Sequence, residues 1–255
     1  MKFIRYQYGD EEPRYGWVLN DMVGPVEGSI FHAYRRMDAN IPLEKVRILS
    51  PVMPSKIIGI HHNYADHALF FGDEVPDIPR CFYKPPSAVI GTGDIILLPP
   101  QSRQVEHEVN LAIIIGKKGR WITTDEAMSY VFGYTAANDI TARDLIRRDR
   151  GPERGKGFDT FCPVGPWIET DLDPVDTMIT CRVNNELRQM TSTREMIFNI
   201  PQLVSYISSF TTLYPGDLIL TGSPAGVDVL RPGDKVEITI EGVGVLINWV
   251  EQEIR

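Results

Sequence analysis

Apolar and polar residues alternate over many short stretches of this chain, which is the pattern of half-buried β-strands. Two such stretches, 3–8 and 15–19, are separated by the turn-forming sequence GDEEP. Further strands are predicted at 56–60, 87–90, 95–98, 105–115, 131–138, 178–183, 218–221, 235–240 and 245–250. The chain is therefore expected to be a β-rich α+β protein.

Helical spacing is confined to two segments. Residues 124–130 begin with Thr124 as a candidate N-cap, and residues 200–210 have apolar side chains at helical spacing with Pro201 in the first turn. Prolines divide the chain near residue 50, which predicts a small N-terminal β domain over 1–50 and a larger domain over 51–255. Residues 64–81 carry acids, a glycine and prolines without periodicity, so we expect a loop or short helix that serves as a lid.

Composition places the chain among globular proteins. It has 255 residues, of which 43% are hydrophobic and 24% charged, and a formal net charge of -8 at pH 7. This acidic balance argues against nucleic acid and anionic membranes as partners. Three cysteines without a CxxC pattern suit a reducing compartment, and no apolar stretch approaches the ~18 residues that span a bilayer, so a cytoplasmic location is expected.

Three carboxylates are candidates for a metal site. Glu106 and Glu108 are two residues apart in the predicted strand 105–115, so both project from one face. Asp139 follows the apolar strand 131–138, where a carboxylate usually faces a cleft. Such oxygens favour Mg²⁺, Mn²⁺ or Ca²⁺ over zinc, and like charges side by side need a cation. The alternatives are a solvated edge strand for the glutamates and an Asx turn or helix N-cap for Asp139.

Other polar motifs leave fewer possibilities. Lys156 is flanked by glycines in RGKGFD, where it is either a site lysine or a solvated loop cation. The sequence lacks a Walker A loop, a GxSxG elbow and a GxGxxG turn, which argues against nucleotide binding, serine hydrolase chemistry and a Rossmann domain. The histidine cluster HHNYADH follows the strand 56–60, and only its last member, His67, is favoured as a general base.

Seven segments occur in the order and spacing of one known family: GIHHNYADH, VEHEVNLAIIIGKKGR, YTAANDITARDL, KGFDTFCPVGPWI, VNNELRQ, FNIPQLVSYIS and LTGSPAGV. Over roughly residues 50–255 the chain resembles the fumarylacetoacetate hydrolase family. The resemblance implies a mixed β-roll catalytic domain, a homodimer, and Mg²⁺- or Mn²⁺-dependent chemistry on small 2-oxo or dicarbonyl acids, as in aromatic catabolism.

The same resemblance implies roles for individual residues. The matching positions are, for the metal, Glu106, Glu108 and Asp139; for substrate, Arg143 and Thr221; and for catalysis, Lys156 and His67. A metal chelated by a 2-oxo acid would polarise its carbonyl and stabilise an enolate, and Lys156 would add positive charge beside it. His67 on the lid would activate a water.

The chain departs from the acylpyruvate hydrolase branch of that family at the lid. Where that branch has a glutamate three residues after the lid histidine, this chain has Phe70, and Ile146 stands where the branch has a glutamine. Asp73 or Glu74, further along the same loop, could hold the imidazole of His67 in place of the missing glutamate.

The sequence therefore predicts a metal-dependent hydrolase that cleaves a C–C bond in an acylpyruvate-like 2,4-dioxo acid. Two alternatives stay open. An isomerase or decarboxylase of a hydroxymuconate-type or 2-oxo diacid, such as 2-hydroxyhepta-2,4-diene-1,7-dioate or oxaloacetate, needs the metal but no water-activating pair. A non-catalytic metal- or ligand-binding domain would explain Phe70 and Ile146 as decay, but the presence of the three carboxylates and Lys156 argues against it.

Overall fold

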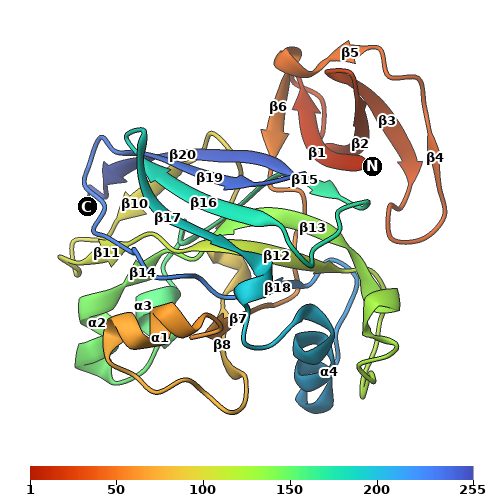
Figure 1. Ribbon diagram of the computed structural model, residues 1–255. Coiled ribbons are helices and arrows are strands. Elements are labelled where there is room, and N and C mark those ends of the chain that lie inside the picture. The colour runs from red at the N-terminus through yellow and green to blue at the C-terminus, as the bar shows by residue number, and fades with distance from the viewer. Residues whose placement is uncertain (255) are drawn as a thin grey trace.

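The first fifty residues form a small β unit at one end of the molecule (Figure 1). The computed structural model describes residues 1–254. Within this unit β1 pairs with both β2 and β6, and β3 pairs with β2, β4 and β5. Its elements are β1 (Lys2–Tyr8), β2 (Arg14–Leu19), β3 (Met22–Gly28), β4 (Tyr34–Arg36), β5 (Ile41–Pro42), the 3₁₀ turn η1 (Leu43–Lys45) and β6 (Val46–Leu49).

One sheet runs through this unit and into the rest of the chain. Its strand order is β4-β3-β2-β1-β15-β13-β12-β18-β7-β8, and β1 joins the two parts by pairing antiparallel with β15. The strands added beyond residue 50 are β7 (Ile57–His61), β8 (Arg80–Lys84), β9 (Val89–Ile90), β12 (Val109–Ile115), β13 (Val131–Asn138), β15 (Cys162–Glu169) and β18 (Leu218–Leu220).

A five-stranded sheet packs against the large one (Figure 1). Its members are β10 (Ile95–Leu98), β16 (Met178–Val183), β17 (Glu186–Ser192), β19 (Lys235–Ile240) and β20 (Gly244–Gln252). No strand was predicted at β17. It forms because Asn184 and Asn185 turn the chain at φ of 52° and 67°, the left-handed conformation that a two-residue hairpin requires and asparagine tolerates.

The segment 105–115, predicted as one strand, is broken after Glu106. β11 (Val105–Glu106) pairs with β14 (Thr141–Ala142), whereas β12 pairs with β13 and β18. The two halves have different neighbours, so His107 and Glu108 lie at the break between them. The expectation of one continuous strand is therefore wrong. Glu106 and Glu108 nevertheless lie on the same side of this segment, where both contact Arg143.

Helices lie mostly at the lower edge of the sheets in Figure 1. They are α1 (Ala65–Phe71), α2 (Arg143–Asp149), α3 (Glu153–Lys156) and α4 (Ile200–Phe210), with 3₁₀ turns η2 (Pro86–Ala88), η3 (Ala127–Tyr130) and η4 (Thr193–Glu195). α4 has the predicted bounds because a capping box with Asn199 and Gln202 begins it. The predicted helix 124–130 is only the single turn η3, and Thr124 does not cap it. None of the helices in residues 1–254 is long and apolar enough to cross a membrane.

Strand β12 lies at the centre of the hydrophobic core and is buried on both faces. Along β12, Leu111, Ile113 and Ile115 join a cluster with the five-stranded sheet and α4, while Ala112 and Ile114 join a second cluster on the other face. This two-residue alternation buries both faces of the strand. A strand fixed on both sides holds the residues at its ends in place, and the polar candidates lie at those ends.

Candidate active site

The three predicted carboxylates meet in one buried cluster. Glu106 ends β11, Glu108 lies in the break before β12, and Asp139 follows β13. The β11–β14 pairing and a 2.9 Å hydrogen bond from the Asp139 amide to the Glu108 carbonyl draw these segments together. Their residues are only 4%, 5% and 3% exposed, which excludes solvation as the compensation for their charges.

Three cations interleave with these carboxylates. Arg143, at the start of α2, donates from Nε to Glu106 at 2.8 Å and from Nη2 to Glu108. The Lys156 ammonium lies 2.8 Å from Glu108 Oε2 and 2.5 Å from Asp139 Oδ2. A second lysine, Lys84, lies 2.7 Å from Asp139 Oδ1. The buried charges thus balance in number, and deletion of one partner would leave an uncompensated charge.

This arrangement shifts the titration of the central carboxylate. Burial alone would raise the pKa of Glu108, but the adjacent Lys156 and Arg143 hold that pKa well below its usual range. Glu108 is therefore an anion throughout the neutral range.

The donor set fits a hard divalent cation, but its present arrangement is an ion-pair network. Three buried carboxylates supply the oxygen ligands that Mg²⁺ and Mn²⁺ prefer. Each of their oxygens already accepts from a protein donor, with Gln104 on the remaining Glu106 oxygen. Across residues 1–254, no three His, Cys, Asp or Glu side chains stand as a ready metal centre. Cation binding by all three carboxylates therefore requires these donors to shift, above all Arg143 between the two glutamates and Lys156 between Glu108 and Asp139.

The predicted lid histidine, His67, lies on helix α1. His67 is 5% exposed, and its Nδ1 contacts the Ser223 carbonyl. A carbonyl oxygen only accepts, so Nδ1 carries the hydrogen and Nε2 is left with a lone pair. In the same helix the Phe71 ring lies 4.4 Å from the Arg143 guanidinium and 5.1 Å from the His67 ring. Helix α1 therefore touches the ion-pair network through Phe71.

The two acids proposed as partners of His67 do not reach it. Asp73 Oδ2 lies 3.2 Å from Nε2 of His62 instead. Glu74 makes no ion pair or side-chain hydrogen bond within residues 1–254. The lid histidine thus has a backbone carbonyl as its polar partner in place of a carboxylate. The Thr221 hydroxyl, predicted to contact substrate, donates to the Leu111 carbonyl at 2.9 Å and is committed to the sheet.

Two residues of the site were not predicted. Lys84 comes from the end of β8. His61, from the end of β7, packs against Phe82 with 4.4 Å between ring centroids and the rings tilted by 43°. The only local signal for Lys84 was a cation before two prolines, a feature that many solvated lysines share. His61 belonged to the histidine cluster but was not favoured for chemistry.

His61 leads to a prediction about pH. Burial, followed by the charge of Lys156, lowers its pKa from 6.5 to about 3. Below its ordinary pKa the unfolded chain takes up a proton that the folded protein does not, so stability falls as the pH falls. We expect His61→Asn to remove this component, at most about 1.4 kcal/mol per pH unit. Urea unfolding of both proteins between about pH 7 and pH 5 measures the difference, and parallel curves would contradict it.

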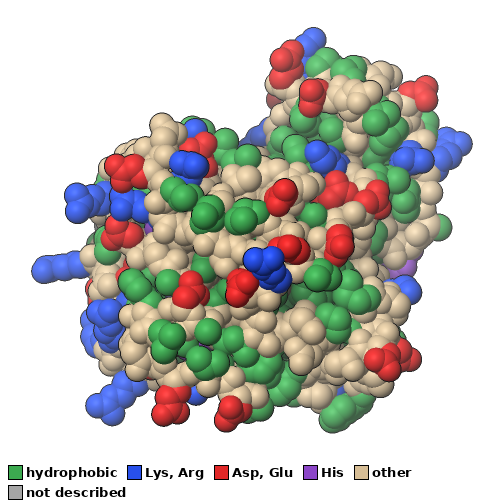
Figure 2. All heavy atoms as spheres, viewed as in Figure 1, with side chains coloured by type: hydrophobic (Ala, Val, Ile, Leu, Met, Phe, Trp, Pro, Cys, Tyr) green, Lys and Arg blue, Asp and Glu red, His purple; other side chains and the backbone are tan. Residues whose placement is uncertain are grey.

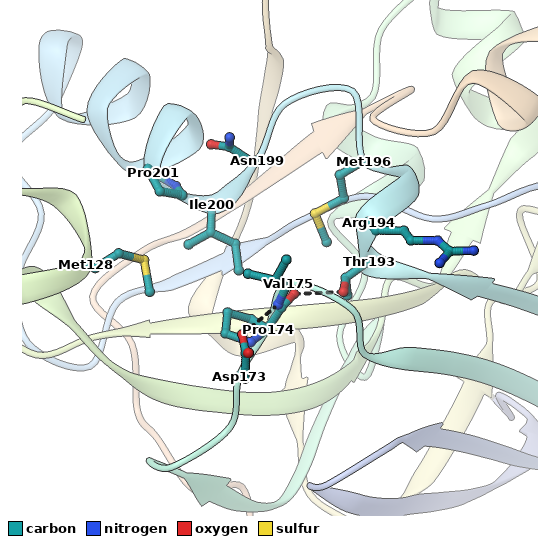
Figure 3. Close-up of a pocket in the computed structure, with 10 residues that line it drawn as sticks. All are labelled: Met128, Asp173, Pro174, Val175, Thr193, Arg194, Met196, Asn199, Ile200 and Pro201. Atoms are coloured by element: carbon teal, nitrogen blue, oxygen red, sulfur yellow. Dashed lines mark hydrogen bonds between the residues drawn. The ribbon is translucent and has the colours of Figure 1, made fainter. Parts of the chain in front are cut away.

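Two features of the surface lie apart from the site. Figure 2 shows acidic and basic side chains mixed over one face of the molecule. An apolar pocket of about 400 Å³ opens between η3, η4 and the start of α4, with Met128, Val175 and Ile200 in its wall (Figure 3). None of the predicted site residues lines this pocket.

Comparison with known proteins decides the family. A model described as fumarylacetoacetate (FAA) hydrolase C-terminal matches residues 56–251. The chain belongs to the fumarylacetoacetate hydrolase family. A second model, described as Rv2993c-like, N-terminal, matches residues 1–51. The predicted family and the β-rich α+β fold are thereby confirmed.

Relatives within the fumarylacetoacetate hydrolase family differ in their named activities. The mitochondrial oxaloacetate tautomerase FAHD2B of Bos taurus is 44% identical over 223 residues, or 82% of this chain and 71% of that protein. The 2-hydroxyhepta-2,4-diene-1,7-dioate isomerase of Mycobacterium marinum superposes with a TM-score of 0.92 at 36% identity, covering 100% of both chains. Maleylpyruvate hydrolase of Sphingobium sp. SYK-6, solved with manganese(II) and pyruvate, has a TM-score of 0.82 at 31% identity, again over 100% of both. The chain is thus similar throughout to enzymes, and the classes are hydrolase, isomerase and tautomerase.

Proposed function

We propose that this enzyme is a divalent-metal-dependent keto–enol tautomerase of a small 2-oxo dicarboxylic acid of the oxaloacetate class. The observation that carries the proposal is the lid histidine without a carboxylate. His67 contacts the Ser223 carbonyl, Phe70 follows it on α1, and Asp73 pairs with His62. A water-activating pair is therefore not assembled, whereas a lone imidazole can still move a proton. The similarity to oxaloacetate tautomerases supports this choice.

Tautomerisation requires a proton acceptor and a stabilised enolate. One proton leaves C3 of the keto acid, and one is delivered to the oxygen on C2, with no bond to water formed. The lone pair on Nε2 of His67 suits the first step, because Nδ1 is held by a carbonyl. The ammonium groups of Lys156 and Lys84 lie within the carboxylate network, so their charge is available where negative charge develops on oxygen.

Arg143 connects the metal and the substrate in this proposal. Glu106, Glu108 and Asp139 would hold Mg²⁺ or Mn²⁺, which would supply Lewis-acid polarisation of the 2-oxo carbonyl. Because Arg143 now occupies the space between the two glutamates, its guanidinium would be released to bind a substrate carboxylate. The bidentate geometry that now fits two glutamates fits a carboxylate ligand equally well.

A second candidate is the C–C bond hydrolase predicted from the sequence. It is favoured by the similarity to maleylpyruvate hydrolase and by the place of Asp73 and Glu74 directly after α1. Hydrolysis would require Asp73 to leave His62, or Glu74 to turn inward, so that a carboxylate meets His67. An isomerase of a hydroxymuconate-type diacid would use the same proton transfer as the tautomerase.

The decisive experiment follows the ultraviolet absorbance of the enol form of oxaloacetate. We expect enol–keto conversion to be accelerated with Mg²⁺ or Mn²⁺ and to fall to the background rate with a chelator. An acylpyruvate offered under the same conditions should remain intact. Release of pyruvate from the acylpyruvate, with no effect on oxaloacetate, would overturn the proposal in favour of the hydrolase.

Substitutions on the lid separate the two candidates. For a tautomerase we expect His67→Ala to lower kcat by roughly 10²-fold or more, because the proton acceptor is lost. Asp73→Asn and Glu74→Gln should change kcat by less than about twofold, since neither carboxylate contacts His67. Steady-state kinetics on oxaloacetate measures all three variants. A large loss in either acid variant would point to the hydrolytic pair.

The lid itself makes a further prediction. Residues 64–81 contain α1, which is anchored by the buried His67 and Ala68. After its left-handed cap Gly72 comes a largely exposed stretch that includes Val75 and Ile78, and few contacts hold this stretch. Binding of oxalate, a 2-oxo acid mimic, with Mg²⁺ should slow amide hydrogen exchange in this segment, whereas α4 should exchange at an unchanged rate. Equal exchange in 64–81 with and without oxalate would refute a lid role.

The assembly and location predicted from the sequence remain predictions. We infer a homodimer, which light scattering of the purified protein tests, and a cytoplasmic location, which fractionation of the source cells tests.

A further inference from the structure

His107 lies between two catalytic glutamates, yet its side chain belongs to the other side of the strand break. It is fully buried, and its Nδ1 lies 2.9 Å from Gln189 Oε1 on β17 and 3.3 Å from Cys181 Sγ on β16. It therefore contacts the five-stranded sheet, whereas Glu106 and Glu108 contact the catalytic cations. At the break after β11, the glutamates therefore face the ion-pair network on one side, and His107 faces the five-stranded sheet on the other.

The surrounding hydrogen bonds fix the tautomer of His107. The amide nitrogen of Gln189 donates to the Ser223 hydroxyl and to the Pro224 carbonyl, both at 2.8 Å, so its Oε1 is the acceptor. Nδ1 of His107 consequently carries the hydrogen, and Nε2 is a bare acceptor. Among residues 1–254, this buried Nε2 has no hydrogen-bond partner. A buried acceptor without a donor is rare in folded proteins and calls for an occupant.

A polar cavity of about 230 Å³ adjoins this histidine; we call it the back cavity. Its wall includes His107, Arg188, Arg231, Asp228 and Asp234. Both aspartates are engaged, since Asp228 pairs with Arg188 at 3.3 Å and Asp234 accepts from Asn184 and from the Arg231 amide. The Arg231 guanidinium makes no ion pair or hydrogen bond in the described chain. The cavity thus offers one unpaired cation and one unpaired acceptor.

We propose that the back cavity is a second ligand site, for a small 2-hydroxy carboxylate. The carboxylate pairs with Arg231, and the hydroxyl donates to Nε2 of His107 once the cavity wall shifts to uncover this fully buried atom, so one molecule satisfies both groups. The cavity has room for several waters at about 30 Å³ each, hence for a ligand of malate size. This proposal does not depend on the tautomerase assignment, because it uses none of the residues of the ion-pair network.

The back cavity also touches the catalytic side through one shared residue. Gln189 holds both His107 and the Ser223 hydroxyl, and the Ser223 carbonyl holds the catalytic candidate His67. A ligand on His107 therefore lies two hydrogen-bonded residues from the lid, which is the position of an effector site.

Calorimetric titration with L-malate, in a chelator so that no metal recruits it to the catalytic cluster, tests the proposal. We expect one site per chain, at least about tenfold weaker binding of succinate, which lacks the hydroxyl, and loss of malate binding in Arg231→Gln. Arg182→Gln, an exposed arginine of β16, is the matched control and should bind as the parent does.

Three results would overturn the proposal. Equal affinity for malate and succinate would remove the role of His107. Binding retained in Arg231→Gln but lost in Arg143→Gln would place malate in the catalytic cluster. Absence of malate binding to the parent protein would show that the back cavity is not a site for a 2-hydroxy carboxylate. A crystal structure with malate locates the ligand directly, and none of these readouts requires the enzyme to be a tautomerase.

Discussion

We expect replacement of Lys156 by methionine to lower the rate of the proposed tautomerase reaction by about 10²- to 10³-fold. Lys156 is 1% exposed, and its ammonium bridges Glu108 and Asp139, so it is a fixed charge in a site without competing water. Methionine keeps much of the length of the side chain but removes the charge that would face the enolate oxygen. The loss should therefore appear in kcat, because that charge acts most strongly where negative charge develops.

Kinetics on oxaloacetate with saturating Mg²⁺ measures this effect. Lys117→Met, at an exposed lysine beyond β12, is the control and should keep the parent rate. Circular dichroism of both variants separates a catalytic loss from unfolding, since the methionine at 156 also leaves two carboxylates with one cation fewer. A Lys156→Met enzyme that is folded and fully active would remove Lys156 from the mechanism.

If Glu108 is a metal ligand as proposed, we expect its replacement by alanine to lower the affinity for Mn²⁺ by at least about 10²-fold. This carboxylate is the central one of the three: it contacts both Arg143 and Lys156, and its depressed pKa keeps it charged. Without Glu108, only Glu106 and Asp139 would remain of the three proposed metal ligands. Metal-dependent activity should disappear with the affinity.

Titration calorimetry with Mn²⁺ tests the metal ligand independently of activity. Glu153→Ala, an exposed acid on the nearby α3, removes one negative charge without touching the cluster and should bind as the parent does. If Glu108→Ala binds Mn²⁺ as tightly as the parent, the metal lies elsewhere and the assignment of all three carboxylates is wrong.

The sequence predicted best those elements whose signals are local. The start of helix 200–210 is encoded locally, because Asn199 and Gln202 form a capping box on either side of Pro201. The predicted bounds of strands 178–183 and 235–240 match the structure, because apolar and polar residues alternate over six residues in each. The break after Glu106 could not be foreseen, because it depends on which strand pairs with each half, and β14 lies far along the chain.

The site shows the same limit. The family motifs predicted five residues of the ion-pair network, and the structure brings these five together: Glu106, Glu108, Asp139, Arg143 and Lys156. Lys84 reaches Asp139 across 55 positions of sequence, and nothing local distinguishes it from a surface lysine. The partner of His67 is likewise a matter of tertiary contacts: proximity in sequence suggested Asp73, but in the fold Asp73 pairs with His62.

By pairing with β15, strand β1 of the N-terminal unit covers what would otherwise be an exposed edge of the large sheet. Phe3 and Lys2 pair with Ile168 and Glu169, and the Phe3 ring packs 5.6 Å from Phe132. A chain truncated to residues 52–255 would bare these hydrogen-bonding groups beside an uncovered aromatic ring, and a bare edge recruits further strands. We therefore expect association through the bared edge of β15, more than loss of chemistry, to be the hazard of working with residues 52–255 alone. The small unit removes that edge by continuing the sheet to the three-residue strand β4.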